Sequence, residues 1–160
     1  MDIRIFTDGS SLGNPGPGGY CAIIKTPSKK IVVKGGEAHT TNNRMEMSAA
    51  IAALYYLRKK LPKLKECTIY SDSILLVNTI KQNWKKKKNT DLWQQLIRLI
   101  SEFDKVEWHW IKGHSGHPEN TEADKVAVKE ALKRKLHRGK KVDEKNILPS
   151  KVEHVQYTLI

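Results

Sequence analysis

The sequence has few cysteines and no long hydrophobic run. Its two cysteines, Cys21 and Cys67, show neither CxxC spacing nor any other metal-site pattern. They are expected to be reduced thiols of a cytosolic protein, and a disulfide between them is the less favoured alternative. The longest nearly apolar run, Met47–Leu57, is too short to span a bilayer, and the charged N-terminus lacks a signal-peptide core. These absences predict a cytoplasmic protein without a membrane segment.

Acidic residues are also scarce relative to basic ones. The chain carries 17 Asp and Glu against 29 Lys and Arg, which gives a formal net charge of +12. A charge of that size attracts polyanions over long range, and nucleic acid is a better candidate than an anionic membrane. With 160 residues, of which 39% are hydrophobic, the chain is long and apolar enough for one domain with a real core.

Strand and helix patterns alternate along the chain up to residue 136. Residues 3–8 alternate as in a strand, and residues 20–25 and 29–36 favour two more strands joined by a turn. The remaining predicted elements are a helix starting at Thr41, Asn42 or Asn43, a strand at 67–73, a helix with Leu76, Val77, Ile80 and Trp84 on one side, a helix at 91–103, a strand at 106–112, and a helix capped by Asn120 and ending near Leu136. This order predicts an α/β domain over residues 1–136 with a mixed sheet.

Residues 137–160 differ from the rest of the chain. They are polar and basic and include Gly139 and Pro149. A mobile tail is the favoured interpretation. The alternative is a segment docked on the domain, because the last nine residues, VEHVQYTLI, show partial strand-like alternation.

Four acids occupy the ends of strands or the starts of helices. Asp8 and Asp72 close predicted strands, while Glu46 and Asp124 lie early in predicted helices. Each has a structural explanation, since an acid stabilises a helix N-terminus and Asp starts turns. Together they predict one pocket beyond the carboxyl ends of strands, where ligands bind in α/β sheets. Carboxylates that close would repel one another unless a hard divalent cation such as Mg²⁺ or Mn²⁺ bound them.

The stretch after Asp8 is rich in glycine and proline. We expect its glycines to leave room for a bulky ligand, because a backbone without side chains can approach a nucleic-acid groove closely.

Four stretches resemble the motifs of type 1 ribonuclease H, the bacterial ribonuclease HI branch: FTDGSSLGNPGPGGY, TTNNRMEM, YSDS and WIKGHSGHPENTEAD. They occur in the family's order across residues 1–136. The resemblance implies a ribonuclease H-like α/β fold, with a five-stranded mixed sheet flanked by helices. It also implies an endonuclease that cuts the RNA strand of an RNA–DNA hybrid, with no obligate protein partner, so that a monomer is expected.

The resemblance also assigns the catalytic residues. It implies that Asp8, Glu46, Asp72 and Asp124 hold two Mg²⁺ ions, with Mn²⁺ as a substitute, and that the products carry 5′-phosphate and 3′-hydroxyl ends. One ion would activate the attacking water and the other would stabilise the leaving oxygen. The family's mobile histidine corresponds to His114, which would move protons or help release product.

His114 has two other interpretations. It could be an ordinary histidine of a surface loop, or it could bind zinc together with His109 and His117. The zinc pattern is weak, because these residues come from a predicted strand and a loop rich in glycine and proline.

The 2′-hydroxyl group must distinguish the RNA strand from DNA. The resemblance implies that Glu46 and five other residues lie along the RNA strand, namely Gly9, Ser10, Asn14, Asn42 and Asn43. It places Thr41, Arg44 and Asn89 at a phosphate of the DNA strand. Trp84 would stack near that strand, although core packing explains it equally well. The TTNN stretch is also explained by helix capping, and both roles can hold because a helix N-terminus binds phosphate.

Three positions depart from the family pattern. The basic protrusion between the second and third helices is shortened to a stretch containing Lys85–Lys88, which we interpret as a reduced phosphate-contact patch rather than only a solvated surface. Ile74 replaces a frequent glutamine, so a polar contact to RNA is missing. His39 stands where an arginine often helps to bind phosphate.

Two other function classes remain open from the sequence. One is a non-catalytic module that binds hybrid or double-stranded RNA, which would gain nothing from carboxylates facing phosphates. The other is a metal nuclease or strand transferase of the same fold that acts on DNA. The TTNNRME and GHSGHPEN stretches favour ribonuclease H over both.

Overall fold

A computed structural model describes residues 1–113, 116–137 and 154–159 of the chain. In order, its elements are β1 (Arg4–Ser11), β2 (Gly16–Lys25), β3 (Lys29–Thr40), α1 (Asn42–Lys60), β4 (Glu66–Ser71), α2 (Ile74–Lys81), α3 (Thr90–Ser101), β5 (Lys105–Trp110), α4 (Pro118–His137) and β6 (His154–Leu159). The α/β fold and the order of elements predicted for the domain are confirmed.

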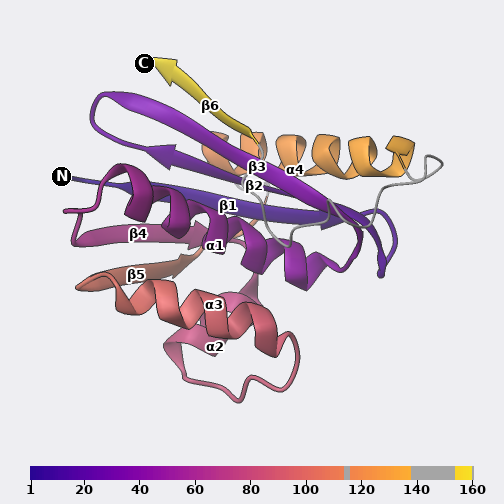
Figure 1. Cartoon of the computed structure of the whole chain (residues 1–160), viewed down its shortest axis with the longest axis horizontal. Coiled ribbons are helices and arrows are strands. Elements are labelled where there is room, and N and C mark those ends of the chain that lie inside the picture. The colour runs from indigo at the N-terminus through magenta and orange to yellow at the C-terminus, as the bar shows by residue number, and fades with distance from the viewer. Residues whose placement is uncertain (114–115, 138–153, 160) are drawn as a thin grey trace.

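The strands of the described residues belong to one mixed sheet with the order β5-β4-β1-β2-β3-β6 (Figure 1). β4 is parallel to both β1 and β5, whereas β2 pairs antiparallel with β1 and β3. The five predicted strands are therefore present as a mixed sheet. β6 adds a sixth strand, which pairs antiparallel with the outer edge of β3 and lies in the segment 137–160.

Helices cover both faces of the sheet (Figure 1). On one face, α1, α2 and α3 bury the larger core, which includes Ile5, Leu54 and Leu96. On the other face, α4 covers a smaller core around Phe6 and Ile23. This arrangement brings the N-terminal parts of α1 and α4 near β1 from opposite faces.

The start of α1 is determined by one of the three residues that could cap it. The Thr41 hydroxyl accepts a hydrogen bond from the backbone N–H of Arg44 at 3.2 Å, so Thr41 is the N-cap. Small alanines, among them Ala49 and Ala53, are fully buried and let the helix lie close to the sheet.

One predicted strand boundary near the site is wrong. β1 does not end near Asp8 but continues to Ser11, because antiparallel pairing with β2 extends that far. The parallel pairing with β4, in contrast, stops at Thr7. Asp8 thus lies inside one strand pair and just past the end of the other.

Two predictions about helix ends also need correction. α2 ends at Lys81, so Trp84 is not on that helix; its side chain is 42% exposed and its indole N–H bonds to Gln82 at 3.0 Å. α4 begins at Pro118 rather than after Asn120, because proline at the first helical position lacks only an N–H that would have no partner in the helix. Asn120 is therefore buried within the first turn.

Candidate active site

Three carboxylates meet where the parallel pairing of β1 with β4 ends. Asp8 comes from β1, Asp72 directly follows β4, and Glu46 lies in the second turn of α1. Each offers an oxygen, and these oxygens all lie within 4.8 Å of one another. The register explains the meeting of the two aspartates: Thr7 pairs with Ser71, so the next residue on each strand is an aspartate.

Gly9 allows α1 to bring Glu46 to the strands. A Cβ at Gly9 would lie only 2.3 Å from the backbone nitrogen of Glu46. A side chain there would push the helix start, and with it Glu46, away from Asp8. Gly19 is equally close to α4, since a Cβ there would lie 2.2 Å from the Ala127 oxygen. We expected the glycines to leave room for a ligand. At these two positions, however, glycine is needed because a helix packs against the backbone.

The carboxylates are held where their charges are costly. Burial raises the pKa of Asp8 from its usual 3.8 to about 7, and the charges of Asp72 and Asp124 act in the same direction. Burial also raises the pKa of Glu46 well above its usual value, with the nearby charge of Asp8 as the next cause. Among the described residues, nothing hydrogen-bonds the buried Oε2 of Glu46.

This arrangement fits a hard divalent cation. The donors are all carboxylate oxygens, which Mg²⁺ and Mn²⁺ prefer. A bound cation would relieve the repulsion between Asp8, Glu46 and Asp72. It would also coordinate the Glu46 Oε2 atom, which has no hydrogen-bond partner among the described residues. Within the described part of the chain, the zinc alternative has no comparable cluster; His109 instead lies 3.1 Å from a Glu107 oxygen.

The other two predicted catalytic residues are Asp124 and His114. Asp124 is half-buried in the second turn of α4, not in its first turn, because the helix begins earlier than expected. Its charge reaches Asp8 and raises the pKa of that residue, but Asp124 is not one of the three clustered ligands. His114 lies outside the described residues.

Several predicted RNA-binding residues join the β1–β2 turn to the start of α1. The Asn42 side-chain oxygen accepts a hydrogen bond from the Ser11 N–H at 2.7 Å. The Asn14 side-chain oxygen accepts one from the Asn42 N–H at 3.2 Å. Ser10 is half-buried on the same strand end, and Asn43 is exposed. The helix N-terminus and the turn therefore form one surface beside the carboxylates.

The predicted DNA-strand residues Arg44 and Asn89 are joined by a residue that the sequence did not reveal. Arg44 donates to both carboxylate oxygens of Asp91, at 3.0 and 2.8 Å, and to the Asn89 side chain at 3.2 Å. Asp91 is 47 residues further along the chain. No local spacing signals such a pair, so only the packing of α3 against α1 could reveal it.

The lysine-rich loop lines a cavity of about 220 Å³ next to this surface. The cavity connects the loop with the starts of α1, α2 and α3, and its lining includes Asn43, Ser73, Lys85–Lys88, Asn89 and Trp93. Lys86 lies over the Trp93 ring, 5.6 Å from its centroid. Sequence reasoning missed Trp93, because its helical spacing resembles that of a core residue.

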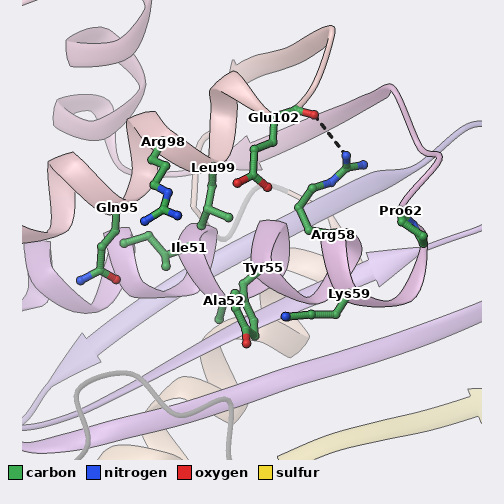
Figure 2. Close-up of a pocket in the computed structure, with 10 residues that line it drawn as sticks. All are labelled: Ile51, Ala52, Tyr55, Arg58, Lys59, Pro62, Gln95, Arg98, Leu99 and Glu102. Atoms are coloured by element: carbon green, nitrogen blue, oxygen red, sulfur yellow. Dashed lines mark hydrogen bonds between the residues drawn. The ribbon is translucent and has the colours of Figure 1, made fainter.

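A larger cavity, of about 780 Å³, contains none of these acids (Figure 2). It lies between the C-terminal half of α1 and α3, where Arg58 donates a hydrogen bond to the Glu102 backbone oxygen at 3.1 Å. Size alone therefore does not identify the site; the convergence of acids does.

The RNase H family model matches residues 1–132. The chain belongs to the RNase H family. A ribonuclease H from Helicobacter pylori strain HPAG1 is 46% identical over 142 residues, covering 84% of this chain and 96% of the relative. A ribonuclease H from Bradyrhizobium sp. strain ORS 278 is 46% identical over 138 residues, covering 78% of this chain and 86% of the relative. These relatives place the chain in the type 1, bacterial branch as an RNase H enzyme.

Solved structures agree with this assignment. The N-terminal RNase H domain of rv2228c from Mycobacterium tuberculosis has a TM-score of 0.74 at 30% identity, covering 85% of this chain and 97% of that one. LC11-RNase H1 in complex with an RNA/DNA hybrid has a TM-score of 0.70 at 26% identity, covering 82% and 98%. Among the described residues of the present structure, no helix is long and apolar enough to cross a membrane.

Proposed function

We propose that this RNase H hydrolyses the RNA strand of RNA–DNA hybrids with two divalent ions and leaves 5′-phosphate and 3′-hydroxyl ends. The cluster of Asp8, Glu46 and Asp72 carries the proposal, because three acids this close, with Asp8 and Glu46 buried, need a cation. We assign Mg²⁺ as the ion, with Mn²⁺ as a substitute, and Asp124 as the fourth ligand.

The protein's own groups have separate tasks in this scheme. Bound ions supply an activated water and charge stabilisation at the leaving oxygen. β1, β4 and α1 hold three of the ligands on rigid elements, which limits the movement of their oxygens. His114 is assigned to proton transfer or product release, as a histidine with a near-neutral pKa suits both.

The hybrid is proposed to lie across the start of α1. LC11-RNase H1 was solved with an RNA/DNA hybrid, which supports a hybrid as the ligand here. The RNA strand would run along the β1–β2 turn and the start of α1, where its 2′-hydroxyl groups would contact polar groups. The RNA-strand residues in this assignment are Gly9, Ser10, Asn14, Asn42, Asn43 and Glu46.

The DNA strand would lie toward the lysine-lined cavity. Thr41, Arg44 and Asn89 would meet one of its phosphates, and Trp84 would stack beside it. A guanidinium has five N–H donors, so the three bonds to Asp91 and Asn89 orient Arg44 without using all of them. Lys85–Lys88 add charge along the same path.

The decisive experiment is cleavage of an RNA–DNA hybrid with either strand labelled, in Mg²⁺, in Mn²⁺ or in EDTA. The expected result is metal-dependent cutting of the RNA strand alone, which Asp72→Asn abolishes while the variant still binds hybrid. A DNA duplex and an RNA duplex serve as controls. Binding without cutting would contradict the proposal and favour a non-catalytic module, and cutting of the DNA duplex would favour a DNA nuclease.

A further inference from the structure

The N-terminal half of α4 is attached to the sheet by two ion pairs. Lys25, at the end of β2, places its ammonium 2.6 Å from a Glu119 oxygen. Lys30, at the start of β3, lies 3.0 Å from each oxygen of Glu122. Both pairs join the β2–β3 hairpin to one helix across more than 90 residues of sequence.

The two lysines face each other across the hairpin. Lys25 and Lys30 are paired in the β2–β3 register. Like charges directly opposite each other on antiparallel strands repel, so this pair costs stability unless each charge finds an acid. Each lysine meets a different glutamate, and Lys25 lowers the pKa of Glu119 through its hydrogen bond. The hairpin end therefore acts as a two-point attachment rather than a single ion pair.

Small side chains of α4 lie against the sheet just after these attachments. Ala123 and Ala127 are fully buried against the sheet. Alanines allow close approach but offer no large side chain that would lock the rotation of a helix about its own axis. Near the start of α4, the ion pairs with Glu119 and Glu122 supply that restraint; further along the helix, Glu130 lies 3.6 Å from Lys34 of β3.

Asp124 lies on the opposite flank of the same helix. At about 100° per residue, Asp124 is about 140° around the axis from Glu119 and about 160° from Glu122. The charge of Asp124 reaches Asp8, whereas the two glutamates face the hairpin. A rotation that loosened the glutamates would therefore move Asp124 relative to Asp8.

We propose that Lys25 and Lys30 are positioning residues for Asp124: by holding Glu119 and Glu122, they set the rotation of α4 that brings the fourth carboxylate to the metal site. The inference rests on the proposed function, in which Asp124 is a metal ligand. It assigns a task in metal binding to two surface lysines on the far side of the helix from the site.

The test compares charge removal with charge reversal. The double variant Lys25→Gln, Lys30→Gln removes both ion pairs. A fourfold variant rebuilds both pairs with the charges exchanged; it carries Lys25→Glu, Lys30→Glu, Glu119→Lys and Glu122→Lys. Lys133→Gln is the matched control, because it breaks an ion pair with Glu130 within α4, 2.9 Å long, and leaves the contact of Glu130 with Lys34 of β3 in place. Asp124→Asn gives the effect of losing the carboxylate itself.

Two measurements are made on each variant. Electron paramagnetic resonance follows Mn²⁺ binding to the protein without substrate, and hybrid cleavage is followed across Mg²⁺ concentrations. We expect the double glutamine variant to weaken Mn²⁺ binding and to raise the half-saturating Mg²⁺ concentration about three- to tenfold, less than Asp124→Asn does, with an unchanged KM for hybrid. The charge-reversed variant should recover most of this loss, and Lys133→Gln should show none.

Unchanged metal binding in the double glutamine variant would overturn the proposal, as would a loss that the control shares or that the reversed pairs do not restore. An Asp124→Asn variant that binds Mn²⁺ normally would also overturn it. The Mn²⁺ measurement does not depend on turnover. If the wild-type protein failed to cut hybrid, the function proposal would fall while the positioning of Asp124 would still be tested.

Discussion

Two buried glutamates on opposite faces of the same sheet have opposite surroundings. Glu46 on α1 faces two other acids, and its pKa is raised by burial and by the charge of Asp8. Glu130 on α4 is fully buried, but it lies 2.9 Å from Lys133, 3.1 Å from Arg134 and 3.6 Å from Lys34. Burial alone would raise the pKa of Glu130, yet the hydrogen bond from Lys133 and the three positive charges lower it.

The difference shows how to distinguish a structural acid from a functional one. A buried carboxylate with its own cations contributes to the folded state, because removing either partner leaves a buried charge unpaired. A buried carboxylate without them costs stability, and the protein tolerates that cost where the group has a task. Glu46 and Asp8 are of the second kind, and Glu130 is of the first.

The largest expected effect is on catalysis at Asp8. Asp8→Asn should lower kcat for hybrid cleavage by about a thousandfold or more, because a metal ligand contributes several kcal/mol to the transition state. Single-turnover cleavage at saturating Mg²⁺ measures this. A loss below tenfold in a folded variant would place Asp8 outside the metal site.

Glu130→Gln should lower the stability of the folded protein more than the rate of hybrid cleavage. We expect a loss of about 3 kcal/mol in the free energy of unfolding, since Lys34, Lys133 and Arg134 lose their shared partner. Because the folded-state pKa of Glu130 is lowered, its stabilisation is present above its usual pKa and is lost as pH falls below it. Urea denaturation at neutral and acidic pH should show the two proteins converging in acid.

The pH dependence of the metal-free protein should carry the opposite sign at Asp8. Its pKa is raised from 3.8 to about 7, so the folded protein keeps a proton that the unfolded chain loses near its usual pKa. The contribution of this group is full below about pH 4 and is lost as pH rises toward 7. In EDTA, Asp8→Asn should therefore become more stable than wild type by about 1–3 kcal/mol at pH 7, and by less at pH 5. A stability difference between Asp8→Asn and wild type that is the same at pH 5 and pH 7 would contradict the raised pKa of Asp8.

The exposed pair between Arg44 and Asp91 should give the smallest effect. The Asp91 side chain is 57% exposed, and a hydrogen bond from Arg44 lowers its pKa. Asp91→Asn should cost about 0.5 kcal/mol or less at low salt and nearly nothing at high salt, because solvent screens exposed pairs. Thermal denaturation at the two salt concentrations measures this, with Asp104→Asn at another exposed pair as the control. A large loss would show that this pair behaves like the buried one at Glu130.

Much of the candidate site could be predicted from the sequence because its acids stand in local patterns. Asp8 and Asp72 follow alternating apolar residues, and Glu46 follows a capping threonine, so strand and helix periodicity placed them near element ends. The same local reasoning misplaced the end of β1. The continuation of β1 to Ser11 depends on pairing with β2 rather than on its own alternation.

Contacts between distant segments could not be predicted in this way. The pair of Arg44 with Asp91 spans 47 residues and that of Lys25 with Glu119 spans 94. Neither leaves a spacing signal. Trp93 likewise has the spacing of a core residue, and only the fold places it on the lysine-lined cavity.

By itself, the sequence determined the family, the basic charge, the order of strands and helices, and the acids that could bind a metal. It could do so because propensities, caps and motifs act between residues only a few positions apart. The tertiary structure alone decided that Asp8, Glu46 and Asp72 converge within 4.8 Å, and that Glu130 instead meets three cations. Strand register and the close packing of α1 and α4 at glycines set those distances, and both depend on the whole folded sheet.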